Sequence, residues 1–201
     1  VIAGGDEITL ICNARAALDV VTAYFSALDE ENRSLPDEQK NYACAGIAIA
    51  HSHAPFSDVY EIAEQCCESG KKKSRAQDSR VNYVDFHFCR SGITNDMETI
   101  RETQEAGLTA RPYEVSAELS GFISAGQRLS EIGRANIKDL AAAMIKGDSY
   151  YRFEVERIKS RYPAAGLDSS DETLRKLIFD IAQVYDIWFA KSETDEQEAS
   201  E

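Results

Sequence analysis

Four residues near the start of the chain have the types and the order of a metal-binding turn, Gly4-Gly5-Asp6-Glu7. Two short β-prone runs flank this tetrapeptide, so it predicts a β-hairpin with both carboxylates at its tip. Adjacent carboxylates repel each other, and a hard divalent cation such as Mg²⁺ or Mn²⁺ relieves that repulsion by taking oxygen ligands. Gly4 and Gly5 have no Cβ, which lets a ligand approach the backbone. Taken alone, the tetrapeptide also fits an ordinary turn with a solvated acid.

A basic cluster further along the chain supplies the second element of a candidate site, Lys71, Lys72, Lys73 and Arg75. The chain has a formal net charge of -13, so this cluster stands out. A local positive site in an acidic protein suits a small anionic ligand better than a long polyanion. Carboxylates that hold a metal and a lysine that holds phosphates form the division of labour of phosphoryl transfer. The alternative is a solvated helix C-terminus, which the helix dipole favours.

The order hairpin, helix, strand, helix, strand is predicted for residues 1–90. Asn13 is placed to cap the first helix, whose apolar stripe extends from Ala14 to Leu28. Residues 43–50 are a short, small-residue apolar run, which is typical of a central strand covered on both faces. The second helix is expected from Pro55 to Gly70, ending at the basic cluster.

The last strand of this region is expected at Val81–Cys89, where apolar and polar residues alternate. Alternation predicts an antiparallel or edge strand with one face in water. On that wet face we expect Tyr83, Asp85 and His87, with His87 as a solvated side chain.

Helical patterns replace strand patterns after Gly92. Apolar residues recur at three- and four-residue spacing in three segments, 119–132, 137–145 and 174–188. The capping box Ser169-x-x-Glu172 opens the third segment. Trp188 lies on the apolar face of that segment and is expected in the core. These patterns predict a helical bundle or cap.

The chain is therefore expected to be α+β, with a mixed region at residues 1–92, a helical domain at 93–192 and an acidic tail at 193–201. Its 43% hydrophobic and 28% charged residues fit a globular protein. No apolar run approaches the roughly 20 residues that cross a bilayer. We expect a cytoplasmic protein without a membrane partner.

Cysteines and histidines give weaker signals. The five cysteines include no C-x-x-C pair, so we expect small buried thiols in a reducing compartment. His51 and His53 point to one side of a strand end. Because no third ligand is apparent, we expect them to be ordinary loop or strand-end side chains.

The order of these motifs resembles the GGDEF and class III nucleotidyl-cyclase superfamily. The resemblance rests on Gly4-Gly5-Asp6-Glu7, a following helix, the strand Ala45–Ile49, and Ala63-Glu64 with Gly70-Lys71. The corresponding helix of diguanylate cyclases carries an Ala-Asp pair and then an Ala-Lys pair at that spacing. Within the superfamily, the closer match is the palm of the large subunit of type III CRISPR effector complexes and its stand-alone relatives. This match covers roughly residues 1–113.

The resemblance implies a fold and an activity. The fold is a partial ferredoxin-like palm over residues 1–92, ordered hairpin-α-β-α-β with an antiparallel sheet, and followed by the helical bundle. The activity is Mg-dependent nucleotidyl transfer that makes cyclic oligonucleotides from ATP in antiviral defence. The implied partners are a nucleoside triphosphate, a second palm domain in another copy or the same chain, and a CRISPR ribonucleoprotein.

The resemblance also implies roles for individual residues. The metal-binding and catalytic residues are Asp6 and Glu7, and the nucleotide-binding residues are Gly4, Gly5, Lys71 and Arg75. In a palm of this kind the end of the second helix lies near the hairpin, so a lysine there can take the triphosphate.

Departures from the family pattern leave alternatives open. Position 7 is Glu where the CRISPR palm has a second Asp, and Ile8 replaces the Phe of a standard GGDEF motif. The chain begins three residues before the motif, so we expect a fragment that catalyses poorly without the preceding palm strand and its metal carboxylate. The alternatives are a catalytically degenerate palm that senses nucleotides or acts as a scaffold, and a GGDEF-type dinucleotide cyclase.

Overall fold

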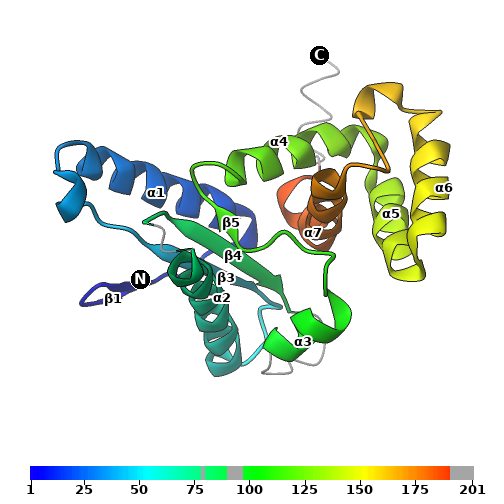
Figure 1. Cartoon of the computed structure of the whole chain (residues 1–201). Helices are drawn as coiled ribbons and strands as arrows, with labels where there is room; N and C mark the ends of the chain where they lie inside the picture. The colour runs from blue at the N-terminus through cyan, green and yellow to red at the C-terminus, as the bar shows by residue number, and fades with distance from the viewer. Residues whose placement is uncertain (78–79, 90–96, 191–201) are drawn as a thin grey trace, which may run out of the picture. The chain divides into compact units, whose positions relative to one another are not determined.

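The chain folds into two compact units, residues 1–42 and residues 43–201. The structure, a computed structural model, describes residues 1–77, 80–89 and 97–190 (Figure 1). Both strands and helices are present, and helices make up most of the C-terminal region, as the sequence predicts. The expected boundary near residue 92 and the acidic tail at 193–201 lie outside the described residues.

The first unit opens with the predicted hairpin, formed by β1 (Ile2–Gly4) and β2 (Glu7–Thr9). The strands are antiparallel, and Gly4 lies opposite Glu7, which leaves a two-residue turn. Gly5 has a φ of 65°, a left-handed conformation that glycine adopts without steric cost. Tight two-residue hairpin turns require such a residue, which explains why glycine occupies this position.

A helical segment completes the first unit. The 3₁₀ turn η1 (Ala14–Ala16) leads directly into α1 (Ala17–Arg33), and the 3₁₀ turn η2 (Asp37–Gln39) follows. The side-chain oxygen of Asn13 accepts a hydrogen bond from the backbone N–H of Arg15 at 3.0 Å. Asn13 is therefore the N-cap that the sequence predicts.

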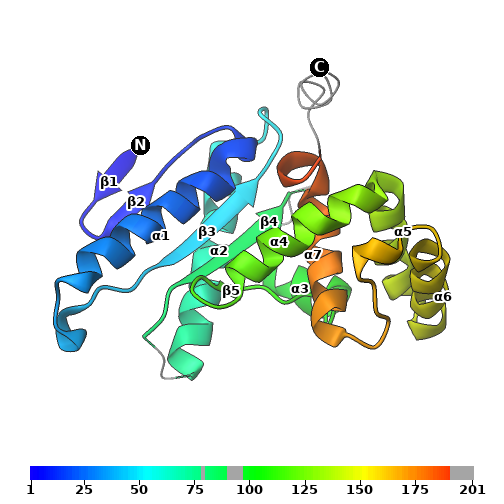
Figure 2. The same cartoon turned by 90° about the horizontal axis from the view of Figure 1, so that it is seen from above.

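The second unit contains a three-stranded sheet with the order β3-β4-β5. The strands are β3 (Cys44–Ile49), β4 (Tyr83–Phe88) and β5 (Tyr113–Glu114). Strands β3 and β4 are parallel and are joined by the helix α2 (Phe56–Ala76), whereas β5 pairs antiparallel with β4 (Figures 1 and 2). The helix is longer than predicted, so the basic cluster lies in its last two turns.

The prediction for the last strand of the mixed region holds in part and is wrong in two respects. Strand β4 pairs antiparallel with β5, but it pairs parallel with β3, and it is the central strand of the described sheet rather than an edge strand. Its polar face is not in water, because Asp85 is 0% exposed and His87 is 8% exposed. Alternation identifies a polar face but does not reveal that other charged side chains cover it. The prediction of a central strand at residues 43–50 is also wrong, since β3 pairs only with β4 in the described sheet.

Helix α2 lies directly on the backbone of the sheet. A Cβ on Gly46 would overlap the carbonyl oxygen of Ala63 and come within 2.5 Å of the backbone nitrogen of Cys67. A Cβ on Gly70 would come within 2.9 Å of the Tyr83 Cβ. These two glycines therefore set the distance between the helix and β3–β4.

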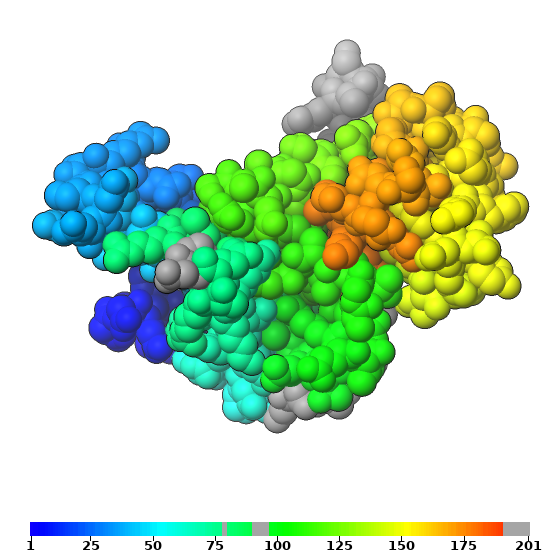
Figure 3. Space-filling view, viewed as in Figure 1, coloured from blue at the N-terminus to red at the C-terminus, as the bar shows by residue number. Residues whose placement is uncertain are grey.

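The rest of the second unit is helical. Its elements are α3 (Met97–Gln104), α4 (Leu119–Leu129), η3 (Ser130–Ile132), α5 (Arg134–Lys146), α6 (Asp148–Lys159), η4 (Pro163–Ala165) and α7 (Glu172–Trp188). The three predicted stripes are confirmed as α4 with η3, α5 and α7. The sequence reading missed α3 and α6, and its expectation that no strand follows Gly92 is wrong because β5 lies there. Helix α6 packs on α5 at the edge of the second unit (yellow in Figure 3).

An aromatic cluster joins the sheet to the helices. The Phe86 ring of β4 lies 5.5 Å from the Phe122 ring of α4 and 5.0 Å from the Trp188 ring of α7, measured between centroids. Phe86 and Phe122 are fully buried. Trp188, expected in the core, packs against this cluster but is only partly buried. The predicted cap at Ser169 is wrong, because the Asp171 side chain accepts the hydrogen bond from Leu174 N at 2.9 Å.

All five cysteines are free thiols, but only one is buried as expected. Cys66 is 0% exposed, whereas Cys12 is exposed. The other three cysteines are partly buried. No helix in the described part of the chain is both long enough and apolar enough to cross a bilayer.

We expect Gly46→Ala to destabilise the second unit by about 1–3 kcal/mol. The added methyl group would overlap the backbone of α2, which cannot move aside as easily as a flexible side chain. The matched control is Gly121→Ala in α4, where a Cβ meets nothing within 4 Å. That change should be neutral or stabilising by up to about 1 kcal/mol. Urea denaturation of both variants measures the difference, and equal stability of the two would contradict the close packing of α2.

Candidate functional site

The predicted carboxylates occupy the hairpin tip. Asp6 lies in the turn, and Glu7 is the first residue of β2; both are exposed. A Cβ placed on Gly4 or Gly5 would meet no heavy atom within 4 Å, so space next to the backbone is open. Two adjacent carboxylates beside an open glycine backbone give the hard oxygen donors that Mg²⁺ prefers, and Mg²⁺ is bound by one or two carboxylates together with substrate phosphates.

The predicted basic residues lie together on the last two turns of α2, in the second unit, whereas the hairpin belongs to the first. Lys72 pairs with Glu98 at 3.1 Å. Arg75 pairs with Glu68 at 2.8 Å, although both side chains are largely exposed and such a pair is weak.

Lys73 is a structural residue rather than a ligand-binding one. Its Nζ donates to the carbonyl oxygen of Pro112 at 2.8 Å and lies 3.3 Å from Glu118. It also lies 5.2 Å from the centre of the Tyr83 ring. These contacts attach the end of α2 to the segment that leads into β5. Lys71 is the member of the cluster that forms no ion pair with a described residue.

The described residues, the hairpin included, contain no group of three potential metal ligands. Among residues 1–77, 80–89 and 97–190, no three side chains of His, Cys, Asp or Glu gather closely enough to hold a metal ion. His51 and His53 follow β3 with ring centres 5.2 Å apart, and both are exposed. Their predicted position at a strand end is confirmed.

A buried charge network that the sequence reading missed lies between the sheet and the helices. Arg101 of α3 donates to both oxygens of Asp85 of β4, at 2.5 and 2.6 Å. Arg111 donates to Glu105 at 2.7 Å and to Asp180 of α7 at 3.0 Å. Arg111 also donates to the carbonyl oxygen of Phe86 at 2.6 Å, so a single guanidinium links β4, α7 and the residue that follows α3.

Asp180 is the acceptor at the centre of this network. Its carboxylate accepts hydrogen bonds from Thr109 Oγ1, the Ala110 backbone N–H and the Tyr113 hydroxyl, at 2.7 to 2.9 Å, besides the one from Arg111. Burial raises the pKa of Asp180, and Arg111 and the other donors oppose that rise. Burial also raises the pKa of Tyr113, so its hydroxyl keeps the proton that it donates.

The sequence does contain a signal for this network. Asp180 interrupts an apolar run in the third predicted helix, between Phe179 and Ile181, where an unpaired acid would be costly. A buried acid in such a run requires a cationic partner, but the sequence does not indicate that Arg111 supplies it from 69 residues away.

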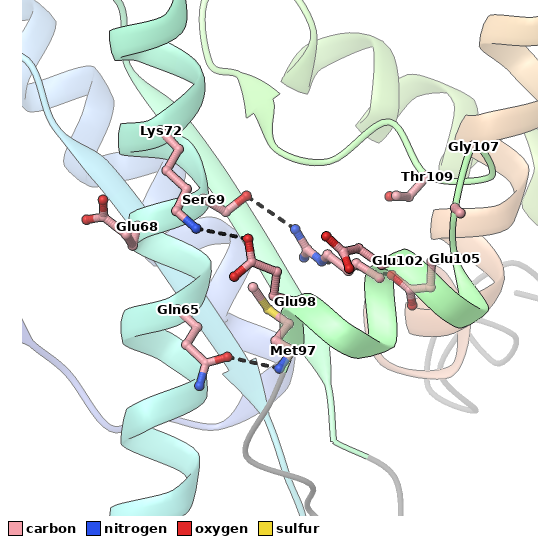
Figure 4. A pocket seen from close by; sticks show the side chains of 12 residues that line it. Gln65, Glu68, Ser69, Lys72, Met97, Glu98, Glu102, Glu105, Gly107 and Thr109 are labelled. Atoms are coloured by element: carbon pink, nitrogen blue, oxygen red, sulfur yellow. Dashed lines mark hydrogen bonds and ion pairs between the residues drawn. The ribbon is translucent and has the colours of Figure 1, made fainter.

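A pocket of about 580 Å³ lies between α2 and α3 (Figure 4). Glu68, Ser69 and Lys72 of α2 line one side, and residues of α3 and the following loop line the other. Polar contacts cross it: Lys72 points to Glu98, and the Gln65 side chain accepts from the Met97 backbone N–H at 3.0 Å. Both lining cations, Lys72 and Arg101, are already paired with carboxylates.

Comparison with protein-family models gives no match, and no curated protein matches the sequence of the chain. The likeness to nucleotidyl-cyclase palms therefore stays a prediction. A function for the chain has to be argued from its own residues.

We expect Arg111→Met to lower the free energy of unfolding by about 3–5 kcal/mol, because it leaves two buried carboxylates without their cation. The matched control is Arg134→Met, which removes an exposed pair with Asp186 and should cost at most about 1 kcal/mol. Chemical denaturation followed by tryptophan fluorescence compares the two. Similar small losses in both variants would show that the buried network does not hold the unit together.

Proposed function

We propose that the chain is a Mg-dependent nucleotide-binding palm domain of the nucleotidyl-cyclase kind. The observation that carries the proposal is the hairpin, which exposes the consecutive residues Asp6 and Glu7 next to the open backbone of Gly4 and Gly5. Two exposed consecutive carboxylates do not stabilise the fold, because like charges repel at short distance. A cation with bound phosphates would offset that repulsion and would make use of the open backbone at Gly4, whereas the turn itself already requires glycine at Gly5.

The proposed ligand is a nucleoside triphosphate, with ATP as the first candidate on the family resemblance. Gly4 and Gly5 give the nucleotide room at the backbone, and Asp6 and Glu7 supply the oxygen donors for Mg²⁺ or Mn²⁺. The bound ion supplies neutralisation of the triphosphate charge. Lys71 is assigned to the phosphates on the family resemblance, in which a lysine at the end of the corresponding helix takes the triphosphate, and among the described residues it forms no ion pair that would compete. Arg75 is a weaker candidate, because it already contacts Glu68.

The proposed reaction is nucleotidyl transfer. A ribose hydroxyl of one nucleotide attacks the α-phosphorus of another, a phosphodiester bond forms, and pyrophosphate leaves with the electrons of the broken bond. Positioning and charge neutralisation dominate the catalysis of this reaction class. Repetition and closure would give cyclic oligonucleotides, the product that the family resemblance suggests for antiviral signalling within a CRISPR ribonucleoprotein.

We expect the double variant Asp6→Ala, Glu7→Ala to bind Mg-ATP at least about 100-fold more weakly, because two charge-assisted ligand contacts are lost. Isothermal titration calorimetry with Mg-ATP and Mg-GTP measures the loss and ranks the two bases. The matched control, Glu30→Ala with Glu31→Ala, removes an adjacent exposed carboxylate pair on α1 in the same unit. Equal affinity of the hairpin variant, the control and the unmodified chain would overturn the proposed site.

We expect Lys71→Ala to weaken Mg-ATP binding about tenfold, as the loss of one charge-assisted contact does. Lys72→Ala, which removes a neighbouring charge already paired with Glu98, should change the affinity by less than about twofold. The same calorimetric titration checks both variants. A larger effect of Lys72→Ala than of Lys71→Ala would exclude the assignment of Lys71 to the phosphates.

Incubation with Mg-ATP and chromatography of the products separates catalysis from sensing. Release of pyrophosphate and formation of 3′–5′ linked products would support the transferase. Binding without turnover would favour the catalytically degenerate palm that senses nucleotides.

A further inference from the structure

His87 is a buried histidine on the face of the sheet that α2 and α3 cover. It is two residues from Asp85 on β4, so the two side chains share a face. Its partner across the parallel pair is Ala48, which packs against Cys66 of α2 and Met97 of α3. The residue is 8% exposed, and its Nδ1 has no hydrogen-bond partner among the residues that the structure describes. Buried polar atoms without a partner are uncommon and need an explanation.

The charged groups around His87 come from three directions. Asp85 lies on its own strand, Arg101 lies on α3, Glu105 directly follows α3, and Arg111 precedes β5. Helix α2 contributes the thiol of Cys66, whose pKa burial raises well above its usual value, so the thiol stays neutral. The neighbour on β3, Ala48, adds no charge.

A positive charge on His87 would have no unpaired carboxylate among the groups named above to balance it. Arg101 already occupies both oxygens of Asp85, and Arg111 occupies Glu105 and Asp180. Burial, and then the positive charge of Arg111, lower the pKa of His87 below its ordinary value of 6.5. The side chain is therefore neutral at pH 7, and charging it places a third cation beside two arginines.

Helix α3 is held to the sheet chiefly by polar contacts. Met97 is its one buried residue among those described, and it contacts the Cys66 sulfur at 3.4 Å. Its polar contacts include the ion pairs of Arg101 with Asp85 and of Glu98 with Lys72, and the hydrogen bond that the Met97 backbone N–H donates to the Gln65 side chain. Arg101 also donates to the Ser69 hydroxyl and to the Phe86 carbonyl oxygen. Because little apolar surface holds this helix, a change in local charge can decide whether it stays docked.

We propose that His87 is the proton sensor of a pH-sensitive latch, in which protonation releases α3 from β4 and opens the pocket between α2 and α3. The docked state binds the proton less well than the released state, in which His87 reaches water. Docking is therefore at full strength above pH 6.5 and weakens as the pH falls through and below that value. The latch acts on the second unit alone and does not depend on nucleotide binding at the hairpin.

Hydrogen exchange of the intact chain at pH 7.5 and pH 5.5, corrected for the intrinsic rates, tests the latch. We expect amides 98–104 of α3 to lose protection at pH 5.5 in the unmodified chain and to keep it in His87→Gln. The matched controls are His51→Gln and His53→Gln, which remove exposed histidines and should behave as the unmodified chain. Equal protection at both pH values, or the same loss in His87→Gln, would overturn the proposal.

If His87→Gln does not fold, an NMR titration of the unmodified chain replaces it. We expect the His87 ring to titrate below its ordinary pKa of 6.5, and the α3 amide signals to shift with the midpoint of His87. Titration of His87 at or above that value, or α3 signals that do not follow it, would overturn the proposal as well.

Discussion

The contact between α2 and the backbone of β3 at Gly46 sets the arrangement of the second unit. Any side chain at that position would meet the helix backbone at Ala63 and Cys67, so the helix can sit this close only because glycine is present. The same helix carries the basic cluster in its last turns and one wall of the pocket. The position of Lys71, the proposed phosphate ligand, therefore depends on a glycine 25 residues earlier in the chain.

The Arg111–Asp180 pair connects the sheet to the helices, because Arg111 also contacts the backbone of β4. Arg111 donates hydrogen bonds to the β4 backbone at Phe86, to Glu105 directly after α3, and to Asp180 of α7. Replacing such a network with apolar groups can be neutral, but removing one partner leaves a buried charge uncompensated. The positive charge of Arg111 in this network adds to the effect of burial, and together they favour the neutral form of His87. Structure and proposed pH response thus arise from the same set of ion pairs.

Local patterns in the sequence were sufficient for part of this architecture. The hairpin at Gly4–Glu7, the cap at Asn13 and the helical stripes of α4, α5 and α7 follow from spacing alone, because the causes are local. The polar face of β4 was predicted to lie in water because of its alternating pattern. That prediction failed because Arg101 of α3 pairs with Asp85, and nothing in the sequence around Arg101 indicates that it packs against this strand. The roles of individual lysines could not be predicted either, since only tertiary contacts distinguish Lys73 from Lys71.

The proposed binding of a metal-bound nucleotide at the hairpin is tested most directly by a crystal structure of the chain with Mg²⁺ and a non-hydrolysable ATP analogue. We expect a metal ion about 2.1 Å from carboxylate oxygens of Asp6 and Glu7, with phosphate oxygens completing its coordination and the nucleotide against Gly4 and Gly5. Nucleotide density in the pocket between α2 and α3, with the hairpin carboxylates free of metal, would contradict it.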